Sequence, residues 1–288
     1  MPPGAAPIRR PPPELAFETP SLPRRLLSRY LVNPVANCIP AGLLRALLRF
    51  AKSQLAEANW IEPGGWRSMV ISYNGCCQQV ADRILVNAGI VPMALRNRKR
   101  LAAHLIAKLI EQSGARTPHV LCLGAGPGWI VMDALAQTHT PARATLVDLS
   151  AEALAFGRRL ASERGLEGRV EFIQADIRQL DGQPIDPPDL VKMVGICEYL
   201  SDEQVVAAAR EVGRMMRPGK PIIFSSVSCT HGAEPFLRRV LGLHLTYRSP
   251  VAACRLAGRA GFGDFEVYPE PLGVYHVIVG RRRCGAGA

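Results

Sequence analysis

The chain has 288 residues, of which 48% are hydrophobic and 20% charged, a composition typical of a globular protein with one large domain or a domain with a cap. Its net charge of +11 lies almost wholly in residues 1–116, which hold 16 Lys and Arg against 6 Asp and Glu. Because only five of the 35 basic residues are lysine and the arginines are scattered among Leu and Ala, we interpret this excess as compositional rather than as a surface for nucleic acid or anionic lipid.

The eight cysteines form no C-x-x-C pair, and no histidine stands at metal-ligand spacing. This argues against a zinc site or a disulfide framework and predicts a reduced, cytoplasmic setting. No stretch reaches about 18 uninterrupted apolar residues, and the N-terminus lacks the apolar core of a signal peptide. We therefore expect no metal, no membrane span and no export, and no pattern indicates an oligomeric state.

The N-terminal third divides into an arm and a helical region. Residues 1–25 contain eight prolines and predict a disordered arm, with a proline-rich ligand for a partner as the alternative to a free tail. Residues 26–114 carry apolar side chains at helical spacing, a break at 62–65 (EPGG), and Pro92 at the start of a last helix that stops near Gly114. They predict a helical cap.

Within this cap, residues 72–78 (SYNGCCQ) place a phenol, an amide and two thiols in an otherwise apolar helix. Two interpretations stay open: Tyr73 and Asn74 face a ligand, or the segment is a buried helix with a packing notch at Gly75.

Residues 118–129 (PHVLCLGAGPGW) are the segment around which the rest is organised. Val120–Leu123 predict a buried strand, Gly124, Gly126 and Gly128 a turn, and the residues after Trp129 a helix. Glycines at such a turn let a nucleotide-like ligand approach the backbone where a strand passes into a helix. The third glycine of a dinucleotide fingerprint would fall at Trp129, so the NAD form G-x-G-x-x-G is not met.

This G-x-G-x-G spacing is similar to motif I of the class I S-adenosylmethionine (SAM) dependent methyltransferases, and four later segments strengthen the resemblance. They are a strand at 144–147 that ends at Asp148, a strand at 170–174 followed by Asp176, residues 189–200 (DLVKMVGICEYL), which resemble motif IV, and residues 215–227 (MMRPGKPIIFSSV). The resemblance covers about residues 92–283.

Alternation of strand and helix predicts an α/β fold with helices on both faces of a parallel sheet. The resemblance implies a doubly wound, Rossmann-like seven-stranded sheet with an antiparallel last strand and an N-terminal helical cap that closes over the SAM pocket. The expected domains are an arm at 1–25, the cap at 26–114, the SAM-binding core at 115–283 and a tail at 284–288.

The resemblance also implies a cofactor site at the carboxyl ends of the strands. Its members are Gly124, Gly126 and Gly128 at the methionine end of SAM, Asp148 with Leu149 at the ribose, Asp176 with Ile177 at the adenine, and Gly195. One departure is Cys122, which stands where many family members carry the acidic residue that anchors the methionine ammonium.

The catalytic candidates are Glu198, Tyr199, Ser226 and Tyr73. Glu198 is a candidate general base or ammonium anchor, and the Tyr199 ring is a candidate cation–π partner of the sulfonium, a contact of roughly 0.5–2 kcal/mol. The alternatives are a solvated carboxylate for Glu198, a packed ring for Tyr199 and an ordinary strand-end residue for Ser226. Three histidines, His231, His244 and His276, are further candidate bases.

Three functions fit these residues. We favour a SAM-dependent methyltransferase that acts on a small molecule in a biosynthetic, secondary-metabolite pathway; GICEY in place of an N-P-P-Y type motif disfavours methylation of DNA bases. The second is a SAM-cyclising azetidine-2-carboxylate synthase, which the missing acid at Cys122 motivates. The third is an RNA-binding protein or RNA methyltransferase using the basic cap, although the chain lacks a motif of interleaved basic and aromatic residues.

Overall fold

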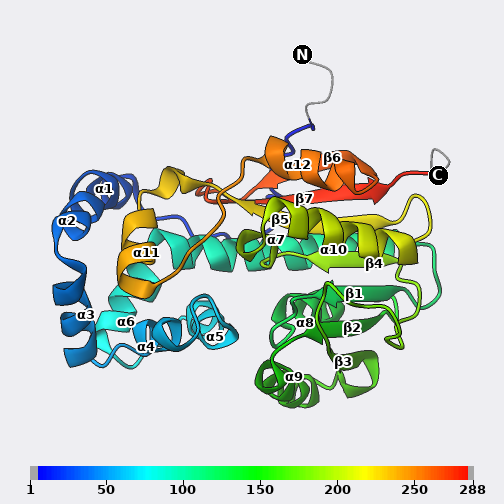
Figure 1. Cartoon of the computed structure of the whole chain (residues 1–288), viewed down its shortest axis with the longest axis horizontal. Helices are drawn as coiled ribbons and strands as arrows, with labels where there is room; N and C mark the ends of the chain where they lie inside the picture. The colour runs from blue at the N-terminus through cyan, green and yellow to red at the C-terminus, as the bar shows by residue number, and fades with distance from the viewer. Residues whose placement is uncertain (1–5, 285–288) are drawn as a thin grey trace.

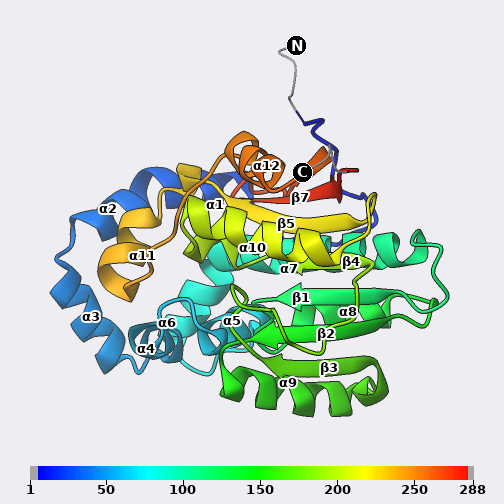
Figure 2. The same cartoon turned by 45° about the vertical axis from the view of Figure 1, so that its right-hand side comes forward.

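Seven apolar segments pair into one mixed sheet, which confirms the predicted fold class. The computed structural model describes residues 6–284, without the side chains of Arg25, Ser28 and Arg29. The strands are β1 (His119–Leu123), β2 (Arg143–Asp148), β3 (Val170–Gln174), β4 (Leu190–Met193), β5 (Pro221–Val227), β6 (Phe262–Pro269) and β7 (Tyr275–Arg282). Their order is β3-β2-β1-β4-β5-β7-β6 (Figure 2). The first five are parallel, and β7 is antiparallel to both β5 and β6.

Alternate residues of the strands point to two separate cores. In β1, Val120 and Cys122 pack with α7 (Ile90–Glu111), α8 (Trp129–Ala136) and α9 (Ala151–Glu163) on one face. Leu121 and Leu123 pack with α10 (Asp202–Met215) and α12 (Pro250–Arg259) on the other. Because every β1 residue is buried, the continuous apolar run in the sequence corresponds to a strand covered on both faces.

Hydroxyl caps fix the starts of the helices that follow the strands. The Ser150 side chain accepts from Ala153 N–H at the start of α9. Ser201 and Gln204 form a capping box at the start of α10. Shorter elements complete the core: η3 (Glu167–Arg169), η4 (Cys197–Tyr199), η5 (Cys229–His231) and α11 (Glu234–Leu241).

A helical cap lies beyond the carboxyl ends of the parallel strands, to the left of the sheet in Figure 1. It contains α1 (Leu22–Leu27), the π-helical turn η1 (Ser28–Val32), α2 (Asn33–Cys38), α3 (Ala41–Phe50), α4 (Gln54–Ile61), α5 (Trp66–Asn74), α6 (Val80–Asp82) and the π-helical turn η2 (Arg83–Ala88). The 22-residue helix α7 joins cap and sheet, since its first turns pack with α11 and its later turns pack under the sheet. No single described helix is long and apolar enough to cross a membrane.

Two backbone reversals divide the cap more finely than the sequence predicts. The helical spacing expected to run unbroken from residue 26 to the break at 62–65 is interrupted at Lys52, whose φ is +50°, and continues as α4. The helix from Trp66 ends at Asn74, because Gly75 adopts a left-handed conformation with φ +65°. Residues 76–79 therefore form a connection, and the two thiols expected on a helix follow its end.

Residues 6–21 lie along the core, although they belong to the segment expected to be a disordered arm. Ile8 forms a parallel bridge with Val267 of β6. Glu18 accepts from Arg96 at 2.6 Å and from Arg100 at 2.8 Å, both on α7. These contacts hold the segment in place; residues 1–5 of the expected arm lie outside the described residues.

Candidate functional site

The turn between β1 and α8 is built from three glycines with positive φ. Gly124, Gly126 and Gly128 have φ of +57°, +53° and +86°. A Cβ on Gly128 would lie 2.2 Å from Leu146 Cδ1, whereas one on Gly126 would approach only Trp66 Cβ, at 3.8 Å. A glycine is therefore favoured at position 128 by its positive φ and by the buried Leu146 side chain, and Gly126 leaves space on the open side of the turn.

Asp148 at the end of β2 holds this turn in place. Its Oδ2 accepts from Gly126 N–H at 2.7 Å, and its Oδ1 accepts from Ser150 N–H at 2.9 Å. Each carboxylate oxygen has a second lone pair, so Asp148 has acceptor capacity left for a ligand.

A cavity of about 310 Å³, here called the loop cavity, lies between the glycine turn and the cap. Its floor comes from β1, β2 and β4, and its roof from residues 62–66 and α5. Trp66 of α5 packs against Phe156 of α9 with ring centroids 5.3 Å apart, and Arg67 pairs with Glu152. The cap is thus attached to the core directly over the cavity.

A buried lysine stands in the floor of the loop cavity. Lys192 of β4 lies in register with Cys122 of β1 and is 3% exposed. Among the residues that the structure describes, no carboxylate forms an ion pair with it. Burial raises the pKa of the Cys122 thiol, although Lys192 opposes the shift, so Cys122 is neutral. Cys122, which stands where many members of the resembled family carry an acidic residue, therefore has a lysine beside it.

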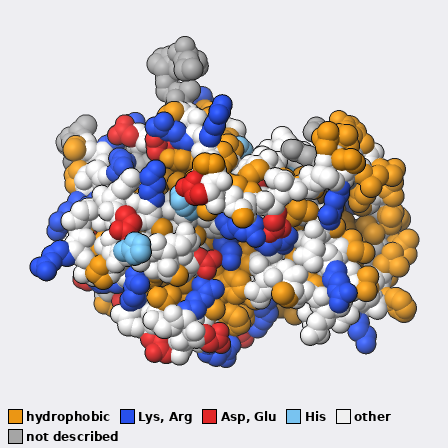
Figure 3. Space-filling view, turned by 180° about the vertical axis from the view of Figure 1, so that it is seen from behind, with side chains coloured by type: hydrophobic (Ala, Val, Ile, Leu, Met, Phe, Trp, Pro, Cys, Tyr) orange, Lys and Arg blue, Asp and Glu red, His pale blue; other side chains and the backbone are white. Residues whose placement is uncertain are grey.

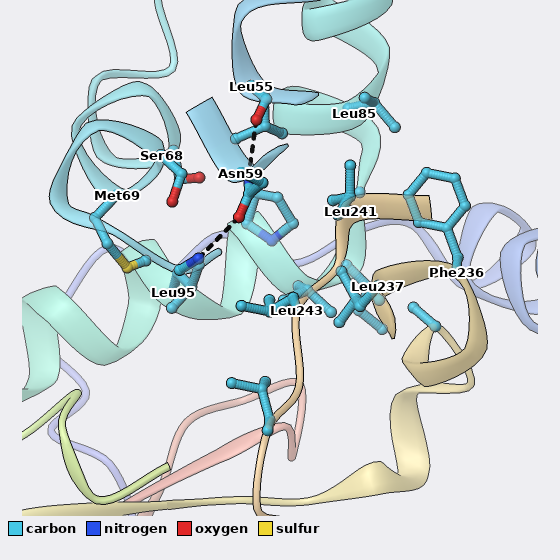
Figure 4. Close-up of a pocket in the computed structure, with 18 of the residues that line it drawn as sticks. Leu55, Asn59, Ser68, Met69, Leu85, Leu95, Phe236, Leu237, Leu241 and Leu243 are labelled. Atoms are coloured by element: carbon cyan, nitrogen blue, oxygen red, sulfur yellow. Dashed lines mark hydrogen bonds between the residues drawn. The ribbon is translucent and has the colours of Figure 1, made fainter. Parts of the chain in front are cut away.

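A second cavity of about 230 Å³, here called the cap cavity, lies among α2, α4, α5, α7 and α11. Its walls are mainly apolar and include seven leucines, with Met69 and Phe236 among the other apolar residues (Figure 4). The polar exceptions include Asn59, which donates to Leu55 O at 2.8 Å and accepts from Gly64 N–H at 3.1 Å. With its amide satisfied in this way, the cavity presents a largely apolar surface.

At the inner end of the cap cavity lies a buried ion pair. Arg98 Nη1 donates to Glu198 Oε1 at 2.6 Å, and the two side chains are 4% and 3% exposed. Ser225 Oγ donates to the same oxygen at 3.1 Å. Burial lowers the pKa of Arg98, but Tyr73 and Glu198 outweigh it and raise the pKa overall. Glu198 Oε2 and Arg98 Nε are buried and have no hydrogen-bond partner among the residues that the structure describes, which is uncommon for charged groups.

The two cavities share a boundary. Gly64, Met69, Arg98 and Tyr199 line both of them. A Cβ on Gly64 would lie 2.3 Å from the Tyr199 hydroxyl, so the glycine makes room for the ring at the junction. On the loop side, Tyr73 stacks on Trp129 at 6.0 Å, and Lys99 Nζ lies 5.1 Å from the Trp129 ring.

The structure brings most of the predicted site residues to these cavities. The loop cavity is lined by Gly124, Gly126, Gly128, Asp148, Leu149, Gly195, Tyr73 and Tyr199, and Glu198 lines the cap cavity.

Three predicted residues line neither cavity. Asp176 pairs with Arg178 at 2.5 Å, and Ile177 is buried in the core beneath β4. Ser226 borders a small separate space behind Glu198, and its Oγ is buried without a partner.

The histidines considered as bases do not line the loop or cap cavity as described. Burial lowers the pKa of His231 to about 4, and its Nδ1 accepts from Ala233 N–H at 3.0 Å. Burial also lowers the pKa of His276. Both rings are therefore suited to the core rather than to proton transfer.

Sequence reasoning missed Arg98 and Lys192. Lys192 had a detectable signal, because it is a single charge inside an otherwise apolar strand. Arg98 had none, because it lies in the basic run 96–100 (RNRKR) and meets Glu198 across 100 positions of sequence. In the described part of the chain, no group of three His, Cys, Asp or Glu residues could hold a metal ion.

Comparison with known proteins agrees with the architecture. Residues 120–219 match the family model described as "Methyltransferase domain". The uncharacterised protein YnbC of Escherichia coli (strain K12) is 28% identical over 217 residues, which cover 71% of this chain and 37% of YnbC. The chain thus spans little more than a third of that relative's length.

Solved structures of low sequence identity share the fold. One from Bordetella parapertussis, described as a possible exported protein, has a TM-score of 0.63 and 16% identity over 76% of this chain and 79% of its own. Magnesium protoporphyrin IX methyltransferase from Synechocystis PCC 6803 with bound SAH has a TM-score of 0.57 and 14% identity, over 83% of this chain and 99% of its own. These matches show that the chain shares its fold with structures that include a methyltransferase.

Proposed function

Because this chain carries a methyltransferase domain with the class I fold, we propose that it binds SAM in the loop cavity and methylates a small, largely apolar acceptor in the cap cavity. The observation that carries the proposal is the shared boundary of the two cavities at Gly64, Met69, Arg98 and Tyr199. A cofactor on one side and an acceptor on the other would meet there. SAM supplies a methyl group on a sulfonium, which transfers by in-line displacement and depends mainly on positioning.

The floor of the loop cavity fits the polar parts of SAM. Asp148 has acceptor capacity for ribose hydroxyls, and the glycine turn lets the ligand approach the backbone. Lys192 fits the methionine carboxylate, because a buried ammonium without an acidic partner is costly unless a ligand supplies the negative charge. In place of an acid at Cys122 that would bind the methionine ammonium of SAM, the neighbouring Lys192 would bind the methionine carboxylate.

The cap cavity fits an acceptor with an apolar body and one hydroxyl or amine. The apolar side chains of its walls suit an apolar body, whereas Glu198 Oε2 is an acceptor that has no donor among the described residues. A group donating to Oε2 would satisfy that atom and lie near the boundary. Arg98, whose pKa is raised, stays charged and orients the carboxylate, which would receive the acceptor proton as general base.

Cyclisation of SAM is the second candidate function, and Lys192 is the observation that favours it. A cation near the methionine amine disfavours its ammonium form. The neutral amine would attack Cγ, the Cγ–S bond would break, methylthioadenosine would leave, and the nitrogen would lose one proton to give azetidine-2-carboxylate. This reaction needs no acceptor and leaves the cap cavity without a role.

Calorimetry and product analysis test both functions. We expect SAM to bind the purified chain, and Asp148→Asn to weaken binding while the exposed control Asp264→Asn does not. Mass spectrometry would then quantify products with SAM alone and with apolar hydroxyl or amine acceptors. S-adenosylhomocysteine that forms only with an acceptor supports methyl transfer, and methylthioadenosine formed without one supports cyclisation. Absence of SAM binding would refute both functions.

A further inference from the structure

The exposed apolar side chains are concentrated on one part of the cap. Ten of the 17 large hydrophobic residues exposed in the described part of the chain fall between Leu22 and Phe50. Figure 3 shows them gathered over α1–α3 at one end of the molecule. Such a contiguous apolar surface marks an interaction site rather than ordinary surface composition. We call this surface, made by the exposed side chains of α1–α3, the cap surface.

Helix α3 shows that the cap surface is not simply the back of a packed helix. Leu44 and Leu48 face inward and pack against the core that α11 shares. Leu43, Leu47 and Phe50, at positions i, i+4 and i+7, face outward with exposures of 54%, 52% and 89%. The helix is therefore apolar on two faces, of which only one has a partner within the chain.

The charge around the cap surface is of one sign. Residues 19–56 contain six Lys and Arg and no Asp or Glu. Arg45 donates to the backbone carbonyls of Arg239 and Val240, and the Arg49 guanidinium lies 5.1 Å from the Trp60 ring. Arg45 thus lies on the inner side of α3, whereas Arg24, Arg49 and Lys52 are exposed and leave the rim of the apolar surface positive.

The geometry suits a surface that lies along a bilayer. The segments Tyr30–Cys38 and Ala41–Phe50 together have the length and composition of a membrane span, but they are bent by 102°. Asn33 of α2 donates to His231 O of η5, and Arg45 of α3 donates to Val240 O of α11, so their inner sides are attached to the core. Anchored in this way, they present a broad face rather than a rod, as interfacial amphipathic helices do.

The cap surface adjoins the cap cavity. Val32 and Ile84 line the cavity and are also exposed, by 52% and 60%. They mark where the cavity reaches the exterior, beside the outward face of α2. An apolar molecule dissolved in a bilayer under this face would have a short apolar route into the cavity.

We propose that the cap surface docks on an anionic phospholipid bilayer, with Leu43, Leu47 and Phe50 at the acyl-chain boundary and the basic side chains among the headgroups. Apolar contact and attraction to anionic lipid act together in this arrangement. A second copy of the chain on the same surface would instead bring the two positive rims together. RNA would use the charges but not the leucines. This inference does not depend on the proposed reaction.

Vesicle sedimentation tests the proposal with the full chain. We expect the protein to sediment with vesicles of phosphatidylglycerol and phosphatidylcholine, and several-fold less with phosphatidylcholine alone. The variant Leu43→Ser/Leu47→Ser/Phe50→Ser should lose about tenfold or more of this binding. The control Ile8→Ser/Val251→Ser, which removes exposed apolar side chains elsewhere, should bind like the parent. The parent, the triple serine variant, the double serine control and Phe50→Trp should all melt at similar temperatures, because the substituted side chains are exposed.

Insertion is measured with Phe50→Trp and vesicles containing brominated acyl chains. Quenching well beyond that of Val251→Trp is expected if Phe50 reaches the acyl boundary. Equal quenching would overturn the proposal, as would equal sedimentation of the triple serine variant and the parent. A dimer in solution that the triple variant converts to a monomer, without vesicle binding, would assign the surface to a second copy instead. RNA binding that the triple variant retains, without vesicle binding, would assign the charges to nucleic acid.

Discussion

At the scale of single residues, the Arg98–Glu198 pair joins stability to the proposed chemistry. Removal of one member of a buried pair leaves an uncompensated charge, which costs about 3–5 kcal/mol. We expect Glu198→Gln to lower the unfolding free energy by about this amount and to lower the rate of methyl transfer by about 100-fold. Urea unfolding and turnover at saturating SAM measure the two effects.

A double substitution separates the two roles. Arg98→Met combined with Glu198→Gln removes both buried charges, so we expect the unfolding free energy to recover in large part. Turnover should stay low, because the base is still missing. Recovery of turnover in the double variant would show that Glu198 acts only through the fold.

Substitution of Lys192 is expected to leave the unfolding free energy unchanged or to raise it, in contrast to substitution of Glu198. Lys192→Met removes a buried cation that has no acidic partner among the described residues. We expect the affinity for SAM, measured by calorimetry, to fall by about tenfold or more, since a charged hydrogen bond contributes about 1.5–3 kcal/mol. The unfolding free energy of the cofactor-free protein should rise or stay unchanged. Lys108→Met, on the exposed side of α7, is the control, and an unchanged SAM affinity in Lys192→Met would remove its assigned role.

The sequence predicted strand-end residues better than it predicted their partners. Asp148 and Asp176 both follow apolar strands, but Asp148 lines the loop cavity whereas Asp176 pairs with Arg178, two residues further on. Local side-chain conformation, which no spacing reveals, distinguishes them. Arg98 was missed because its significance depends on Glu198, which only the tertiary fold brings near.

At the scale of elements, the glycine turn allows a matched comparison. Gly128→Ala and Gly126→Ala both place a side chain at positive φ, which costs about 1–2 kcal/mol. Only Gly128→Ala adds an overlap, with Leu146 Cδ1 at 2.2 Å. We therefore expect the larger loss of unfolding free energy in urea from Gly128→Ala. Equal losses would mean that β2 shifts to accommodate the methyl group.

The core elements were predictable and the cap helices less so, for a physical reason. A strand such as β1 is an apolar run covered on both faces, and its start and end coincide with changes in composition. The cap breaks at Lys52, whose φ is +50°, and Ser53 caps α4 by accepting from Ala56 N–H. A lone serine within apolar helical spacing is a weak signal, and the hydrogen bond that Ser53 donates to Asp82 at 2.5 Å cannot be read from local sequence.

At the scale of the whole molecule, buried histidine links stability to pH. The pKa of His231 is about 4 in the folded chain, lowered by burial from its ordinary 6.5. Folding thus favours the neutral imidazole of His231. The stabilisation of the folded state that this ring provides is fully present above pH 6.5 and is lost as the pH falls toward 4. We expect a loss of about 3 kcal/mol over that range. His231→Asn, which keeps an acceptor for Ala233 N–H, should reduce the pH dependence of unfolding, whereas His139→Asn at the surface should not.

The attachment of α5 to α9 has a kinetic consequence. The roof of the loop cavity is held by the Trp66–Phe156 contact and by the exposed Arg67–Glu152 pair. We expect opening of this roof to precede each exchange of a ligand as large as a nucleoside, because the two contacts attach α5 to α9 over the cavity. The spent cofactor would then depart more slowly than the methyl group is transferred. Product would then form rapidly in the first turnover of each enzyme molecule. Later turnovers would proceed at a slower steady rate, which opening of the roof limits and the chemical step does not.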